Sequence, residues 1–245
     1  MKQSIFTIVE NLPLTDSVCK MILKGDTSDI TASGQFVNIK LEGMYLRRPI
    51  SVCDCEEGKL TIVYKVVGKG TEAMAGMPCG VELDVLTGLG NGYDLSLAGE
   101  APLLIGGGVG VPPMYMLAKK LIEMGKAVKV ILGFNKKEEI FYEDEFKKLG
   151  CEVYVTTVDG SYGTKGFVTD VMKELTYSYF YTCGPEPMLK AIFNTSVTEG
   201  QFSFEERMGC GFGACMGCSC KTVTGYKRIC KEGPVLKKEE ILWQK

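Results

Sequence analysis

Four cysteines close to the C-terminal end of the chain limit what that segment can fold into. Cys210, Cys215, Cys218 and Cys230 are spaced C-x4-C-x2-C-x11-C, and glycines stand beside and between the first three. This spacing matches the plant-type [2Fe-2S] arrangement, in which three thiolates come from one loop and the fourth arrives later. Residues without a Cβ allow the backbone N–H groups of such a loop to approach the cluster sulfurs. The spacing therefore predicts these four cysteines as the ligands of a [2Fe-2S] cluster.

Two plainer interpretations of the same cysteines stay open, a zinc site and a set of unliganded thiols. Zinc knuckles usually bring two C-x2-C pairs, whereas only Cys215 and Cys218 form such a pair here. Cys220 follows closely after Cys218, and we interpret it as a bystander rather than a ligand. The spacing favours iron–sulfur over zinc.

The composition narrows the chemistry further. The chain has 245 residues, eleven cysteines and no histidine, which excludes Ser-His-Asp and Cys-His triads, histidine-ligated haem and histidine-containing zinc hydrolase sites. A net charge of -2 gives no basic surface for nucleic acid or for an anionic membrane. No signal-peptide pattern is present, and the uncharged run 101–118 holds too many glycines and prolines for a spanning helix. We expect a cytoplasmic protein without disulfides, whose chemistry depends on bound cofactors.

Hydrophobic patterns divide the chain into three zones. Residues 1–98 hold short alternating or β-branched runs separated by glycines and predict an antiparallel Greek-key barrel. Residues 99–203 alternate strands with helices and predict a doubly wound parallel α/β domain. Residues 204–245 are rich in glycine and cysteine and too poor in apolar residues to form a core alone, so a small cysteine-rich domain must be held by its neighbours.

Within the α/β zone, hydrophobic periodicity and the positions of proline and glycine predict where helices and strands begin and end. Proline at the start and glycine after the end predict a helix from Pro112 or Pro113 to Met124. A second helix is expected over residues 138–149, and a third begins at Pro185. Strands are expected at residues 102–105, 128–132, 152–157 and 179–183.

Two strand-to-helix junctions are candidates for binding a nucleotide. The Gly-rich loop 106–113 follows a strand and opens a helix. The free N–H groups and the positive dipole end of that helix favour binding of a pyrophosphate. The candidate binding residues of the loop are Gly107, Gly108, Gly110, Val111 and Pro112. Cys183, Gly184 and Pro185 form a second such junction, although Cys183 alone fits a buried core thiol equally well. Asp159 either binds ribose hydroxyls or simply forms a turn.

A nicotinamide exchanges two electrons as hydride, whereas a [2Fe-2S] cluster handles one electron at a time. A chain that carries both needs a converter with a stable one-electron state, and a flavin is the usual one. In the barrel, the segment Arg48, Pro49, Ile50 and Ser51 offers a guanidinium for a phosphate and a nearby hydroxyl. Gly70 and Thr71 lie at the start of a short expected helix that could take a pyrophosphate.

These motifs occur together, in this order, in the ferredoxin–NADP reductase superfamily. The cysteine-rich segment 206–218, together with segments 88–94 and 159–163, narrows the match. Over its whole length the chain closely resembles the electron-transfer subunits of dihydroorotate dehydrogenase B, with the cysteine-rich segment as the most specific element.

The resemblance implies FAD in the barrel, NAD in the α/β domain and one [2Fe-2S] cluster near the C-terminal end. Arg48 would hold the FAD pyrophosphate and Ser51 the flavin ring, with Tyr64, Lys65 and Val66 along the flavin and Gly70 and Thr71 at the pyrophosphate. Electrons taken from dihydroorotate at FMN in a separate catalytic subunit would pass through the cluster and FAD to NAD+, in a heterotetramer with two copies of each subunit. The resemblance implies no residue in this chain that oxidises dihydroorotate.

Two other functions fit parts of the same pattern. A flavin and iron–sulfur gamma subunit of a soluble hydrogenase or sulfhydrogenase shares the three-part plan, and co-purification of its partner would distinguish it. A regulatory module that binds nucleotides and zinc would be colourless, whereas flavin and cluster together are yellow-brown. Met208, Phe212 and Met216 stand among the cluster glycines and are expected to form a docking surface for the partner, unless they pack inward.

Overall fold

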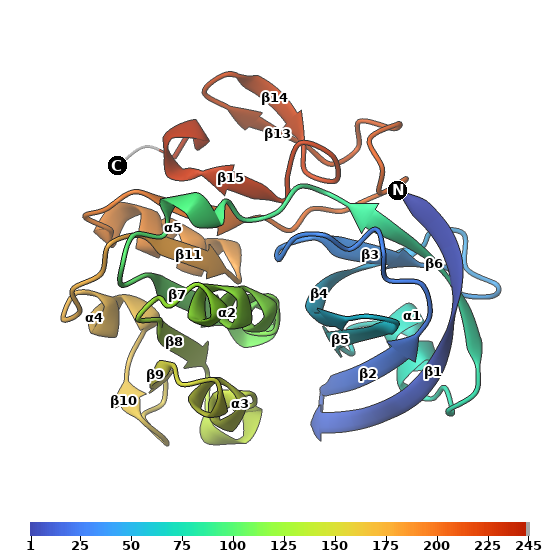
Figure 1. Cartoon of the computed structure of the whole chain (residues 1–245), viewed down its shortest axis with the longest axis horizontal. Helices are drawn as coiled ribbons and strands as arrows, with labels where there is room; N and C mark the ends of the chain where they lie inside the picture. The colour runs from blue at the N-terminus through green and yellow to red at the C-terminus, as the bar shows by residue number, and fades with distance from the viewer. Residues whose placement is uncertain (244–245) are drawn as a thin grey trace.

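The computed structural model describes residues 1–243, and its N-terminal part is a closed barrel of six antiparallel strands (Figure 1). The strand order is β1-β2-β5-β4-β3-β6, which is the expected Greek-key topology. Its elements are β1 (Lys2–Thr15), β2 (Val18–Lys24), β3 (Phe36–Ile39), β4 (Arg48–Glu56), β5 (Lys59–Lys65), the short helix α1 (Lys69–Ala75) and β6 (Glu82–Leu89).

The strands of the barrel turn one set of apolar side chains inward, into a shared core. Val37 and Ile39 of β3, Val52 of β4 and Ile62 of β5 all point inward and share one buried core. The neighbouring positions on these strands face outward, where the remainder of the chain packs against the barrel. The inward set fixes the register of the strands, and therefore which residues of β3 and β4 are available for cofactors.

The middle of the chain forms a sheet that is parallel except at one edge, with the strand order β10-β9-β8-β7-β11-β12-β15. Its strands are β7 (Leu103–Gly107), β8 (Lys129–Phe134), β9 (Glu152–Thr157), β10 (Thr164–Lys165), β11 (Phe180–Cys183), β12 (Gly200–Ser203) and β15 (Val235–Lys237). Helices α2 (Pro113–Glu123) and α3 (Glu143–Lys148) contribute to the core on one face, and α4 (Val168–Met172) and α5 (Glu186–Thr195) to the core on the other. Four 3-10 turns complete the described elements: η1 (Leu95–Leu97), η2 (Gly108–Gly110), η3 (Lys137–Glu139) and η4 (Lys238–Glu240).

The cysteine-rich segment lies across the other two parts. It contains a hairpin of β13 (Ser219–Thr222) and β14 (Gly225–Arg228), and then returns through β15 to pair antiparallel with β12 (Figure 1). Asn91, just after the barrel, accepts a hydrogen bond from the backbone of Val235 and donates to the carbonyls of Glu232 and Val235. The segment is thus held by its neighbours, as its low apolar content requires.

The helix expected over residues 138–149 is wrong in its first half. The structure has the turn η3 and a separate helix α3, with Tyr142 between them in a left-handed conformation at φ 68°. The break allows both Phe141 and Tyr142 to be buried in the core, where Tyr142 meets the ring of Tyr115 edge-on. The other expected helices and strands of this zone are confirmed to within a few residues. Within residues 1–243, no helix combines the length and apolarity needed to cross a bilayer.

Candidate cofactor sites

The cysteine loop has the backbone geometry of an anion-binding site. The N–H groups of Ala214 and Cys215 donate to Sγ of Cys210 at 3.2 and 3.4 Å, and the N–H of Cys230 donates to Sγ of Cys218 at 3.4 Å. Gly211 and Gly213 adopt positive φ angles that give the loop its tight curvature. Partial burial opposes ionisation of Cys210, but the N–H donors outweigh it and lower the pKa of this thiol to about 6.

The four cysteines form two pairs rather than one tetrahedral group. Side-chain hydrogen bonds join Cys210 to Cys215, and Cys218 to Cys230 deeper in the structure, while only an electrostatic interaction links Cys210 with Cys230. Within residues 1–243, no three Cys, Asp or Glu side chains converge on the position of a single metal ion. Two thiolate pairs suit a [2Fe-2S] cluster, because each iron takes two cysteines, better than one zinc ion held by four. Cys220 belongs to neither pair, in agreement with its interpretation as a bystander.

On the barrel, the Arg48 guanidinium lies against Gly70 at the start of α1. A Cβ at Gly70 would lie 2.1 Å from Nε of Arg48, so only glycine lets the guanidinium lie over the start of α1. Arg48 is also held by the Leu46 carbonyl and by Sδ of Met44 at 2.9 Å. These residues fit an FAD pyrophosphate, because a fixed guanidinium and helix-start N–H groups both attract phosphate. The Thr71 hydroxyl, in contrast, is used within the helix start, where it accepts from Val67 and donates to Gly68.

The other flavin candidates are spread over three environments. Ser51 lies opposite Phe36 of β3, and Pro49 lies opposite Asn38. Ile50 packs toward the barrel core, and the Tyr64 ring is buried there with its hydroxyl donating to Asn11. Val66 also packs against this core, whereas Lys65 reaches the cavity of the α/β domain. A flavin beside Tyr64 and Val66 would therefore meet mainly their backbone.

A cavity of about 710 Å³ lies at the carboxyl ends of the parallel strands. Predicted residues that line it are Gly107, Gly108, Gly110, Gly184 and Pro185, joined by Lys65 from the barrel. At Gly110 close approach requires glycine, since a Cβ there would lie 2.2 Å from the Cys183 carbonyl oxygen. The two strand-to-helix junctions thus meet at one place, where open α/β sheets bind nucleotides.

Three predicted nucleotide residues lie behind this cavity rather than in its wall. Val111 and Pro112 are buried at the start of α2 and position the Gly loop. The Cys183 thiol is buried, and burial raises its pKa well above the usual range, so it is a neutral core group.

Several residues of the cavity wall were not predicted from the sequence. Asn135, Glu139, Phe167 and Met188 line it, and the Glu139 carboxylate accepts from the backbone N–H and the side chain of Asn135 at 3.3 and 2.9 Å. Asp159 is not among the lining residues, because its carboxylate caps its own turn by accepting from Ser161. An acidic residue after the second strand of such a domain was the available signal for Glu139.

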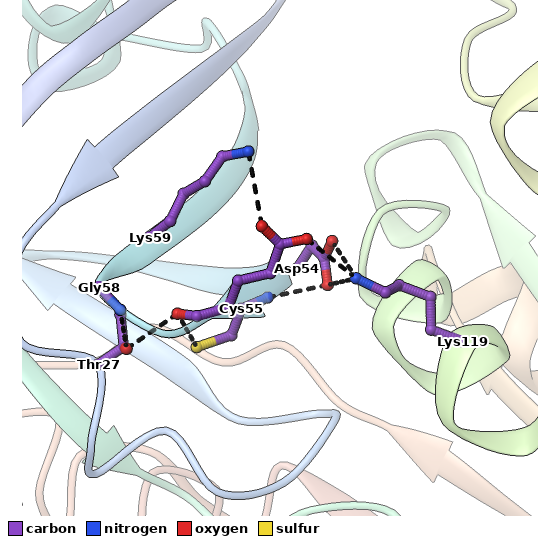
Figure 2. Close-up of polar contacts among 7 residues, drawn as sticks. Thr27, Asp54, Cys55, Gly58, Lys59 and Lys119 are labelled. Atoms are coloured by element: carbon purple, nitrogen blue, oxygen red, sulfur yellow. Dashed lines mark hydrogen bonds and ion pairs between the residues drawn. The ribbon is translucent and has the colours of Figure 1, made fainter. Parts of the chain in front are cut away.

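Contacts between the barrel and α2 set how these sites face one another. Figure 2 shows Lys119 of α2 reaching Asp54 on β4, with Nζ to carboxylate distances of 2.9 and 3.1 Å. Nearby, the buried Cys53 thiol donates to the Tyr142 hydroxyl at 3.2 Å. Polar bonds and apolar packing therefore fix the barrel against the α/β part.

Comparison with known proteins agrees with this geometry. Residues 205–242 match the iron-sulfur cluster binding domain of dihydroorotate dehydrogenase B, and residues 104–193 match the oxidoreductase NAD-binding domain. The dihydroorotate dehydrogenase B (NAD(+)) electron transfer subunit of Fusobacterium nucleatum is 49% identical over 96% of each chain, and that of Bacillus pumilus is 45% identical over 98% of each.

Solved structures give the same fold. The structure of an NADH-dependent reduced ferredoxin-NADP oxidoreductase is 31% identical, with a TM-score of 0.87 over 97% of this chain and 90% of that one. A ferredoxin NADP+ reductase from Neisseria gonorrhoeae with bound FAD and NADP is 18% identical and shares the fold, with a TM-score of 0.70 over 80% of this chain and 90% of that one. The expected barrel, α/β domain and iron–sulfur segment are confirmed, and the chain belongs to the family of dihydroorotate dehydrogenase B electron transfer subunits.

Proposed function

We propose that this chain carries electrons between a dihydroorotate-oxidising partner subunit and NAD+, by way of a [2Fe-2S] cluster and FAD. The observation that carries the proposal is the arrangement of three cofactor sites around the barrel. The cysteine loop touches β3, the strand paired with the flavin strand β4, through a hydrogen bond from Asn38 to the Cys210 carbonyl. Lys65, at the end of the next flavin strand, lines the nucleotide cavity.

The cofactors supply the redox chemistry, in which a flavin converts between single electrons and hydride. The chain binds and orients them. Arg48 and Gly70 would hold the FAD pyrophosphate, and Ser51 the flavin ring, while the two cysteine pairs hold the irons. The Gly loop would take the NAD pyrophosphate, and Glu139 would accept from ribose hydroxyls at the far end of the cavity.

The partner implied by the family is an FMN-containing catalytic subunit, in a cytoplasmic complex of two copies of each chain. Phe212 is 42% exposed and Met216 is 54% exposed beside the cluster ligands, which supports a docking surface there. Met208 instead packs partly against the core that contains Cys218 and Cys230. It therefore packs inward and is not part of the proposed docking surface. We expect dihydroorotate to be oxidised in that partner and not at any residue of this chain.

Reconstitution tests the proposal directly. The isolated holo-chain should pass electrons from NADH to artificial acceptors without oxidising dihydroorotate, and addition of an FMN-containing dihydroorotate dehydrogenase subunit should couple dihydroorotate to NAD+. Dihydroorotate oxidation by the single chain would refute the division of labour.

A second candidate is a subunit of an NADH-dependent reduced ferredoxin-NADP oxidoreductase, favoured by the TM-score of 0.87 with that structure. Purification of the native complex separates the two candidates. A ferredoxin-reducing partner in place of a dihydroorotate-oxidising one would favour this alternative.

A further inference from the structure

Asn38 lies where the flavin strand and the cluster ligands meet. It is on β3, opposite Pro49 of β4, and its side chain is only 2% exposed. The inward positions of β3 are taken by Val37 and Ile39, so Asn38 and Phe36 occupy the outward face. Phe36 packs in the same core as Cys218 and Cys230. The face of the barrel that carries Pro49 and Ser51 is thus the face covered by the cysteine-rich segment.

The Asn38 amide contacts the first cluster ligand directly. Its Nδ2 donates to the backbone carbonyl of Cys210 at 3.3 Å, across 172 residues of sequence. Gly211 makes this approach feasible, since a Cβ there would lie 2.3 Å from Nδ2. The Asn38 backbone carbonyl in turn accepts from Arg47, whose guanidinium also binds the Asp84 carboxylate at 3.0 Å. Both ends of the residue are therefore fixed, one to the barrel and one to the ligand loop.

The oxygen of the Asn38 amide is unusual. Oδ1 of Asn38 is buried and has no hydrogen-bond partner among the described residues. An unpartnered buried acceptor is destabilising, and an apolar side chain of the same size would avoid that cost. The contribution of Asn38 to stability alone does not account for an amide at this position. The hydrogen bond from its Nδ2 to the Cys210 loop explains why an amide stands here.

We infer that Asn38 is a positioning residue for electron transfer between FAD and the cluster. By holding the Cys210 carbonyl, it orients the loop whose N–H groups point at the Cys210 sulfur, and it keeps that loop against the face beside the flavin strand. Hydrogen bonds around ligand sulfurs tune cluster potentials, so a loosened loop changes the cluster as well as its distance to the flavin. The inference rests on the proposed cofactor set and is independent of which partner the chain serves.

The test uses the full chain with its cofactors and NADH as the electron donor. Asn38→Leu keeps the volume and removes the donor. In rapid mixing with NADH, flavin bleaching should keep its rate, whereas cluster reduction, followed at its own wavelength, should slow about fivefold. The electron paramagnetic resonance spectrum and midpoint potential of the reduced cluster should shift. Loss of iron with FAD retained would equally support a role in holding the Cys210 loop. Asn194→Leu, on the exposed side of α5, is the matched control and should behave like the unaltered chain.

Asn38→Asp covers the case in which the leucine variant does not fold. The carboxylate keeps the shape but turns an oxygen toward the Cys210 carbonyl, so cluster reduction should be slow at neutral pH. A cofactor-loaded Asn38 variant with unchanged iron content, cluster spectrum, potential and reduction rate would overturn the inference. Failure to couple to dihydroorotate would instead count against the proposed function alone.

Discussion

Glu139 is the acidic side chain that the fold places at the end of the nucleotide cavity beside β8. Its carboxylate is held by two hydrogen bonds from Asn135, so it cannot swing freely away from a bound ligand. A fixed negative charge accepts hydrogen bonds from a ribose diol and repels a 2′-phosphate. A single residue here would therefore distinguish NAD from NADP.

Replacement of Glu139 by glutamine tests this directly. We expect the preference for NADH over NADPH, measured as the ratio of kcat/KM values, to fall by about tenfold because one repulsive charge is removed. Glu138→Gln, an exposed neighbour on the same turn, should leave the ratio unchanged. If Asp159→Asn alters the ratio and Glu139→Gln does not, the ribose contact belongs to Asp159.

Gly110 provides a second prediction for a single residue. Gly110→Ala would place a Cβ against the Cys183 backbone, where no flexible side chain can move aside. We expect a loss of about 1–3 kcal/mol in the free energy of unfolding, together with weaker NADH binding, because the two strand ends must separate. Thermal unfolding and NADH titration measure both effects. Gly76→Ala, where a Cβ meets nothing closer than 3.8 Å, should change neither.

Between elements, the ion pair of Lys119 on α2 with Asp54 on β4 fixes the barrel against the nucleotide domain. Burial opposes the charge on Lys119, but the hydrogen bond to Asp54 outweighs it and raises the pKa of the lysine. The pair lies between the flavin strand and the helix that begins at the Gly loop. The geometry of this ion pair therefore affects how closely the flavin and nicotinamide rings would approach one another.

Lys119→Met should cost about 1 kcal/mol of stability, since the pair is partly solvated. It should also slow flavin reduction by NADH several-fold through misalignment of the reacting rings. Chemical unfolding and rapid mixing with NADH provide the two measurements. Lys126→Met is the matched control, because Lys126 pairs with the exposed Glu100 within the nucleotide part. Equal effects of the two substitutions would contradict a specific role of the contact between barrel and α2.

For the whole molecule, the exposed apolar side chains beside the cluster define the expected partner surface. Met216→Lys places a charge in that surface, so affinity for the catalytic subunit should fall by at least about tenfold. Iron content and electron transfer from NADH to an artificial acceptor should stay the same. Met124→Lys is the matched control, because it makes the same substitution at an exposed methionine at the end of α2, away from the cluster. It should leave assembly intact. Normal complex formation by the Met216 variant would place the interface elsewhere.

Features that depend on contiguous residues could be predicted before the fold was known. The spacing of Cys210, Cys215 and Cys218, the Gly loop before α2 and the strand β9 are local patterns, because turn geometry and side-chain periodicity act over a few residues. The order of the three zones followed from changes in these patterns along the chain. Resemblance to a known family specified the flavin as FAD and the nucleotide as NAD, and it added the partner.

Contacts between residues that are distant in the chain are established only by the packing of the folded molecule. It placed Lys65 in the wall of the nucleotide cavity, joined β15 to β12 and brought Asn38 to Cys210. It also broke the expected helix at Tyr142, where burial of two aromatic rings outweighed helix periodicity. Such contacts depend on how complete elements pack, and residues far apart in the chain leave no periodic signal of their eventual neighbours.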